Sequence, residues 1–276
     1  MSLSWTIDPL AEEPDPQPSA LTLGPSDPLG ATGVEADLRT FASLGVHGLS
    51  ILTGLYDITG ERTQARPITD AGVLGHRLRD LLRASPPKAI KIGALGSSAT
   101  VRVLDEALSE TAAHPIVFDP ELASEHGEAR VDRETILALR HLAQRATLIT
   151  VNRREAELLT ERRVDGPSSM REAAKALFDL GLDHAVVTGG HLDKIVRDFH
   201  YDGTGFNEFG ADRLGAVKPA GTGAIFSASI TAHLALGHPV ETALERSRTG
   251  VSMAIQEAFS CGGHPIANPL GLVWKR

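Results

Sequence analysis

The chain has 276 residues, 42% of them hydrophobic and 22% charged, with a formal net charge of −8 and one cysteine. The composition is ordinary for a globular protein, the negative charge argues against non-specific nucleic-acid binding, and a lone cysteine excludes an internal disulfide. No apolar run reaches the ~18 residues of a membrane-spanning helix, and one cysteine suits a reducing cytosol. We therefore expect a cytoplasmic protein that binds neither nucleic acid nor membrane.

The N-terminal segment differs from the rest of the chain. Residues Glu12–Pro18 form an acidic, proline-rich tract with almost nothing to bury, and such segments stay disordered. Beyond it, no linker, repeat or low-complexity stretch divides the sequence. We expect a flexible arm over residues 1–18 and a single domain over residues 19–276.

From Ala20 onward, short apolar runs alternate with longer segments whose apolar residues fall on one helical face. This alternation is typical of βαβ units, with a mostly parallel sheet between two layers of helices. We expect strands at Ala20–Leu23, Leu49–Thr53, Ala89–Ile92, Ile116–Phe118, Thr147–Thr150 and Ala185–Val187. Helical patterns cover Leu74–Leu82, Val101–Leu108, Ile136–Leu142 and Ala173–Leu180.

The alternation changes near Ile195–Phe209. Polar and apolar residues interleave there around the turn sequence Gly203–Gly205, which predicts a hairpin of antiparallel strands at the edge of the sheet. Two helices are expected after it, one following Gly223 and one around Val240–Phe259.

Polar and glycine residues follow the predicted strands closely. In an open α/β sheet, ligands bind beyond the carboxyl ends of the strands. These ends carry Gly24–Asp27, Gly93, Asp119–Pro120, Asn152 and Gly189–His191. Because these segments converge on one rim of the sheet, we expect the functional site there.

The segment Lys218–Ala224 has the layout of a phosphate-binding helix start. Gly221, Thr222 and Gly223 precede a helical run, and the unpaired N–H groups of a helix N-terminus attract anions. Glycine-capped packing turns have the same sequence, so the motif alone leaves both interpretations open.

Other candidate residues also have structural alternatives. Asp119–Pro120 is compatible with a plain strand-terminating turn, and Asn152–Glu155 with a helix cap that carries an acidic first turn. Asp37, within a helical segment, would ordinarily be a solvated charge. Cys261 fits a small apolar filler better than a nucleophile. His126, His141, His184 and His264 lack metal-ligand spacing, so we interpret them as structural or surface residues.

The segment Ala20–Gly45 resembles the opening of the hydroxymethylpyrimidine/phosphomethylpyrimidine kinases of thiamine biosynthesis, which belong to the ribokinase-like superfamily together with the pyridoxal kinases. Further matches follow in the family's order and spacing at Ile90–Gly93, Val117–Pro120, Leu148–Glu157, Val186–His191 and Gly221–Gly223. The resemblance implies a three-layer α/β/α fold and a homodimer. It also implies transfer of the ATP γ-phosphoryl group to a hydroxymethyl heterocycle or its monophosphate.

The resemblance also implies roles by matching position. The backbone of Gly221, Thr222 and Gly223 would form the anion hole at the transferring phosphoryl group. Asn152 and Glu155 would serve the Mg²⁺–phosphate assembly, Glu155 on the metal side, and Asp119 would position phosphate or metal. Thr188 and Gly190 would lie at the ATP phosphates, and Asp37 would face the heterocycle.

This chain departs from the family pattern at positions that matter for chemistry. Ala224 stands where these kinases carry a cysteine, and many relatives an aspartate, that takes the proton of the attacking hydroxyl. Ile58 and Ala94 replace a glutamine and a methionine of the acceptor pocket, and Thr188 replaces a lysine that touches ATP phosphate. Losing a general base typically costs ~10²–10⁴-fold in rate.

Three hypotheses follow from this mixture. The chain is a kinase of the pyrimidine/pyridoxal class with slow turnover or a shifted acceptor, or a non-catalytic relative that binds nucleotide or a heterocycle in a regulatory role. A third reading makes it a different group-transfer enzyme whose base is supplied by His191 or Asp27.

Overall fold

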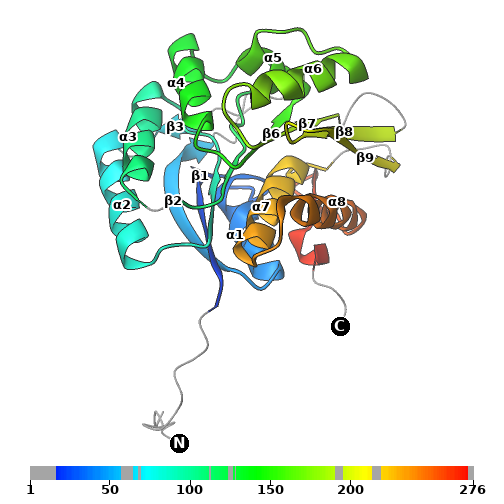
Figure 1. Ribbon diagram of the computed structural model, residues 1–276. Helices are drawn as coiled ribbons and strands as arrows, with labels where there is room; N and C mark the ends of the chain where they lie inside the picture. The colour runs from blue at the N-terminus through cyan, green and yellow to red at the C-terminus, as the bar shows by residue number, and fades with distance from the viewer. Residues whose placement is uncertain are drawn as a thin grey trace, which may run out of the picture.

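The computed structural model describes residues 17–56, 65–67, 70–111, 113–123, 127, 129–189, 195–212 and 219–272. Within these ranges, a nine-stranded sheet lies between two layers of helices (Figure 1). The predicted three-layer α/β/α fold is confirmed. Residues 1–16 of the expected arm lie outside the described residues, whereas Gln17 and Pro18 already hydrogen-bond to Gly45 and His47.

The sheet has the order β3-β2-β1-β4-β5-β6-β7-β8-β9. Strands β1, β2 and β4 to β7 run parallel, and β3, β8 and β9 are antiparallel to their neighbours. The strands are β1 (Ser19–Ser26), β2 (His47–Tyr56), β3 (Ala65–Pro67), β4 (Ala89–Ile92), β5 (Ile116–Phe118), β6 (Leu148–Asn152), β7 (His184–Thr188), β8 (Ile195–Tyr201) and β9 (Phe206–Asp212).

The helices fall on the two faces of this sheet. They are α1 (Gly33–Ser43), α2 (Ala71–Ala84), α3 (Ser98–Ser109), α4 (Arg133–Ala143), α5 (Arg153–Thr160), α6 (Pro167–Phe178), α7 (Thr222–Ala235) and α8 (Val240–Gln256). Helices α2 to α6 share one hydrophobic cluster, and α1, α7 and α8 share another. None of the described helices combines the length and apolar character needed to cross a membrane.

The alternation of side chains along each strand separates the two clusters. In β4, Ile90 and Ile92 pack in the cluster of α2 to α6, so Lys91 between them points to the opposite layer of α1 and α7. Helix α7 is buried almost all round, because it lies between the sheet and α1 and α8. The N-terminus of α7 is thereby fixed at the carboxyl edge of the central strands.

The predicted strands and the edge hairpin are confirmed, but the C-terminal prediction is wrong in two respects. Helix α8 ends at Gln256, and Phe259 begins a short antiparallel ribbon of β10 (Phe259–Cys261) and β11 (His264–Ile266), followed by a 3₁₀ helix, Pro269–Leu272. Cys261 lies in this ribbon and is exposed, so it is not an apolar filler. All three residues of β10 are exposed, so this strand lacks the buried apolar run by which the equally short β5 was recognised in the sequence.

Candidate active site

A cavity of about 520 Å³ opens at the carboxyl ends of β5, β6 and β7, against the N-terminus of α7. It brings together the predicted residues Asp119, Asn152, Glu155, Thr188 and Gly221–Ala224. Asp37 and Ala94 do not line it, and Ile58 and Gly190 lie outside the described residues. The rim predicted from the strand ends therefore holds most of the expected phosphate side of the site.

The first turn of α7 forms the wall of this cavity. Gly221 precedes the helix with φ +89°, and a Cβ atom there would lie 2.0 Å from the carbonyl oxygen of Ala31, so only glycine fits. The N–H groups of Thr222, Gly223 and Ala224 begin the helix and have no acceptor within it. A Cβ at Gly223 would meet nothing within 4 Å, which leaves open space for an anion above these donors.

Ala224 is 6% exposed and presents only a methyl group to the cavity. Its backbone carbonyl oxygen accepts hydrogen bonds from Lys91 Nζ at 3.5 Å and from Ser227 Oγ at 3.2 Å. Position 224 thus has a supported backbone and no acid–base side chain, and its equivalence to the proton-accepting position of the related kinases stays a prediction.

A buried ion pair lies beneath the first turn of α7. Lys91 is fully buried, with Nζ 2.5 Å from Asp37 Oδ1 and 3.9 Å from Asp119 Oδ2, and Thr22 Oγ1 donates to Asp37 Oδ2 at 2.6 Å. Burial alone would lower the pKa of Lys91, but the carboxylates of Asp37, Asp119 and Glu121 outweigh it and raise the pKa. Lys91 therefore remains an ammonium ion under the site.

Lys91 was not among the site residues predicted from the sequence. A lysine inside the apolar run of β4 could have indicated a buried charge there. The general expectation that Asp37 is a solvated charge is wrong, because it is 2% exposed and bound to Lys91. Its implied contact with a heterocycle stays a prediction.

Asp119 follows β5 and is held from two sides. Its backbone N–H donates to the carbonyl of Ile92 at 2.8 Å, and its carboxylate accepts from Ser227 Oγ at 2.6 Å. Burial, opposed by Lys91 and helped by Glu121, raises the pKa of Asp119 to about 7. Ser227, one turn into α7, was not singled out from the sequence.

Asn152 and Glu155 form a reciprocal capping box at the start of α5. Asn152 Oδ1 accepts from Glu155 N at 3.0 Å, and Glu155 Oε2 accepts from Asn152 N at 2.8 Å. The structural alternative is confirmed, yet both residues also line the cavity. Burial, with the charge of Asp119 next, raises the pKa of Glu155 to about 8.

The two carboxylates fit Mg²⁺ in the manner typical of kinases. Carboxylate oxygens are its preferred protein ligands, and it keeps several waters and binds phosphates in addition. Across the described ranges, no three His, Cys, Asp or Glu side chains gather closely enough to hold a metal by themselves. That Asp119 and Glu155 hold Mg²⁺ together with water and nucleotide phosphates stays a prediction.

The ends of β6 and β7 form the other flank of the cavity. Thr188 Oγ1 donates to the carbonyl of Val151 at 3.3 Å, and the buried Thr150 hydroxyl has no hydrogen-bond partner in the described part of the chain. Gly189 N donates to Asp198 Oδ1 at 3.0 Å, and a Cβ at Gly189 would lie 2.1 Å from the carbonyl oxygen of Arg197. The unpaired Thr150 hydroxyl is a ready partner for a bound polar ligand.

Asp27, considered as an alternative base, is occupied by its own loop. Its carboxylate accepts from the backbone N–H groups of Leu29, Ala31 and Thr32 at 2.8–3.0 Å, and it does not line the cavity. It holds the loop against which Gly221 packs. The other candidate, His191, lies outside the described residues.

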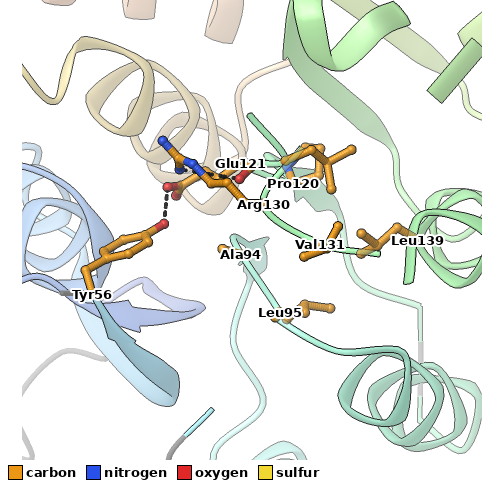
Figure 2. Close-up of a pocket in the computed structure, with 10 residues that line it drawn as sticks. Tyr56, Ala94, Leu95, Pro120, Glu121, Arg130, Val131 and Leu139 are labelled. Atoms are coloured by element: carbon orange, nitrogen blue, oxygen red, sulfur yellow. Dashed lines mark hydrogen bonds between the residues drawn. The ribbon is translucent and has the colours of Figure 1, made fainter. Parts of the chain in front are cut away.

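A second, smaller cavity of about 10 Å³, room for roughly one water molecule, adjoins the first. Ala94 and Tyr56 line it from the ends of β4 and β2, and Glu121 and Arg130 line both cavities. Figure 2 shows the Tyr56 hydroxyl donating to the Glu121 carboxylate, while Arg130 donates to the Glu121 carbonyl at 3.4 Å. Glu121 has φ +49°, an uncommon backbone conformation for a residue with a side chain.

Comparison with known proteins places these features in a family. The family model described as phosphomethylpyrimidine kinase matches residues 27–269. The hydroxymethylpyrimidine/phosphomethylpyrimidine kinase of Streptomyces coelicolor is 32% identical over 247 residues, which cover 89% of this chain and 91% of that protein. A thiamine biosynthesis bifunctional protein of Geobacter sulfurreducens is 32% identical over 260 residues, 92% of this chain, and the chain spans about half (53%) of its length.

Solved structures agree with this assignment. The ADP complex of Bacillus subtilis pyridoxal kinase superimposes with a TM-score of 0.85 at 28% identity, over 94% of this chain and 100% of that one. Phosphomethylpyrimidine kinase of Clostridium difficile gives a TM-score of 0.76 at 26% identity, over 87% and 100% of the chains. The chain belongs to the phosphomethylpyrimidine kinase family, whose members are kinases.

Proposed function

We propose that this protein transfers the γ-phosphoryl group of ATP to the hydroxymethyl group of hydroxymethylpyrimidine and to the phosphate of its monophosphate. The observation that carries the proposal is a single cavity lined both by the first turn of α7, Thr222, Gly223 and Ala224, and by the acidic residues Asp119 and Glu155. Related kinases of this family act on these two substrates, as their names state.

The geometry supports positioning and charge neutralisation. The N-terminus of α7 offers oriented N–H donors and a partial positive charge where the transferring phosphoryl group gains negative charge. Mg²⁺, held through the nucleotide phosphates, water, Asp119 and Glu155, would neutralise the triphosphate and raise its reactivity. Lys91, anchored by Asp37, fixes the carbonyl of Ala224 and the carboxylate of Asp119, so the donors stay aligned.

Ala224 sets the expected rate. Because its methyl group cannot accept a proton, the acceptor hydroxyl must lose its proton to water or to the phosphate itself. A loose phosphoryl-transfer transition state tolerates late deprotonation, so slow turnover rather than none is expected. The same residue, with Thr188 in place of a lysine, supports the second candidate function, a relative that binds nucleotide or a heterocycle without turnover.

The test is ADP release with Mg-ATP and hydroxymethylpyrimidine, its monophosphate or pyridoxal as acceptor. The proposal expects ADP formation above the acceptor-free background with the two pyrimidines, and its loss in Asp119→Asn. Nucleotide binding by calorimetry without ADP release on any acceptor would favour the binding role. Light scattering of the same sample measures whether the chain forms the expected homodimer.

A further inference from the structure

Arg130 occupies a distinct electrostatic position in the site. Among the described residues lining the main cavity, Asp119, Glu121 and Glu155 carry carboxylates, and Arg130 carries the one cationic side chain. Lys91 lies beneath the wall, fully buried and bound to Asp37. Thr188, at the nucleotide flank, has no charge. Among the described lining residues, Arg130 is therefore the side-chain cation that can bind an additional anion in this cavity.

Arg130 lies toward the flank of the main cavity that is away from β6 and β7. It lines the smaller cavity together with Tyr56 from the end of β2 and Ala94 from the end of β4. In the sheet, β2 and β4 lie on one side of β5, whereas β6 and β7, which carry Asn152 and Thr188, lie on the other. Because it lines both cavities, Arg130 is at the junction between the wall formed by α7 and the flank away from β6 and β7.

The local hydrogen bonds leave the guanidinium donors available. In the part of the chain that the structure describes, the one side-chain hydrogen bond of Arg130 goes to the backbone carbonyl of Glu121 at 3.4 Å, and a guanidinium has five N–H donors. The Glu121 carboxylate is occupied by the Tyr56 hydroxyl. Burial and the Glu121 charge raise the pKa of Tyr56, so the phenol keeps the proton that it donates.

We propose that Arg130 binds the phosphate of a monophosphate acceptor and so selects for the second of two transfer steps. The proposal rests on the proposed function and deepens it. An oxygen of the acceptor phosphate attacks the γ-phosphorus of ATP, the bond from that phosphorus to the bridging oxygen breaks, and its electron pair leaves with ADP. Any acceptor proton goes to water. Arg130 offsets the repulsion between the acceptor phosphate, the triphosphate and the three carboxylates.

The experiment compares both acceptors in wild type, Arg130→Gln and Arg130→Lys. The matched control is Arg133→Gln, since Arg133 is 85% exposed and its ion pair with Glu161 is 4.0 Å long. Losing a charge-assisted hydrogen bond predicts a ~10–100-fold rise in KM for hydroxymethylpyrimidine monophosphate in Arg130→Gln, with kcat/KM for hydroxymethylpyrimidine within ~2-fold of wild type. Arg130→Lys keeps the charge, so its KM for the monophosphate should lie between those of wild type and Arg130→Gln. Arg133→Gln should match wild type with both acceptors.

Several outcomes overturn the inference. Equal loss with both acceptors through a higher KM for ATP would place Arg130 on the nucleotide, and unchanged kinetics with the monophosphate would remove it from recognition. If wild type turns over neither pyrimidine, the proposed function fails on its own. Calorimetric titration then decides the inference, because Arg130→Gln must weaken the monophosphate ~10-fold or more and leave hydroxymethylpyrimidine unaffected.

Discussion

The two flanks of the cavity are built in different ways. The phosphate flank consists of backbone N–H groups at α7, a glycine that nothing else can replace, and a buried ion pair under the first turn. The opposite flank, which we call the acceptor flank after the role proposed for Arg130, consists of the side chains of Glu121 and Arg130 in the segment after β5. Tyr56, at the end of β2, lies behind them in the smaller cavity. A backbone-built flank keeps its chemistry while neighbouring side chains change, whereas a flank made of side chains changes specificity with each substitution.

The largest effect is expected from breaking the ion pair under the phosphate flank. Lys91→Met leaves the buried Asp37 carboxylate without its cation, which costs about 3–5 kcal/mol of unfolding free energy. Urea denaturation followed by circular dichroism measures it. The double variant Lys91→Met/Asp37→Leu removes both charges and should recover part of the loss. Equal stability of wild type and Lys91→Met would show that the pair does not support this flank.

The buried carboxylate of Glu155 predicts a pH-dependent stability. Its folded pKa, about 8, lies above the unfolded value, so the folded state binds more protons. The stabilisation that protonated Glu155 gives to the folded state is therefore fully present below the pKa of the unfolded chain. It is lost as the pH rises through the pKa of the folded protein. Glu155→Gln keeps a capping residue at the third position of α5 but removes the titration.

When the pH is raised from 5 to 8, the unfolding free energy of wild type should fall by about 3 kcal/mol more than that of Glu155→Gln. Denaturation curves at both pH values measure this difference. Parallel pH profiles of the two proteins would contradict the raised pKa of Glu155.

A smaller effect on stability, with a large effect on catalysis, is expected at the helix start. Gly221→Ala forces a Cβ against the carbonyl of Ala31 and should lower the unfolding free energy by about 1–3 kcal/mol. Because the first turn of α7 then shifts, ADP formation should also be lost. Gly237→Ala is the matched control, because Gly237 also has positive φ, +83°, but a Cβ there meets nothing within 4 Å. Similar thermal midpoints in the two variants would mean that the contact with Ala31 does not fix the first turn of α7.

On the acceptor flank, Arg130→Gln should leave the unfolding free energy nearly unchanged and should raise the KM for the monophosphate acceptor alone. Substitutions under α7 should affect stability and both acceptors together, and those around Glu121 should affect the choice of acceptor alone.

The grouping of Gly221–Gly223, Asp119 and Asn152 around one cavity could be predicted from the sequence, because each follows a predicted strand or precedes a predicted helix. Strand ends of a parallel sheet meet at one edge, so their residues could be grouped before the structure was known. The ion pair could not be predicted, since Asp37, Lys91 and Asp119 come from separate elements whose side-chain directions depend on register and packing. The Tyr56–Glu121 contact joins residues 65 positions apart, with no periodic signal linking them.

We propose that the cavity supports phosphoryl transfer and that position 224 lacks the proton acceptor for it. The most direct test is the kcat of Ala224→Cys beside wild type, with hydroxymethylpyrimidine and saturating Mg-ATP. The account predicts that the thiol raises kcat by about 10²–10⁴-fold with an unchanged KM for ATP. Equal kcat values in the two proteins would contradict it, because turnover would then not depend on a base at this position.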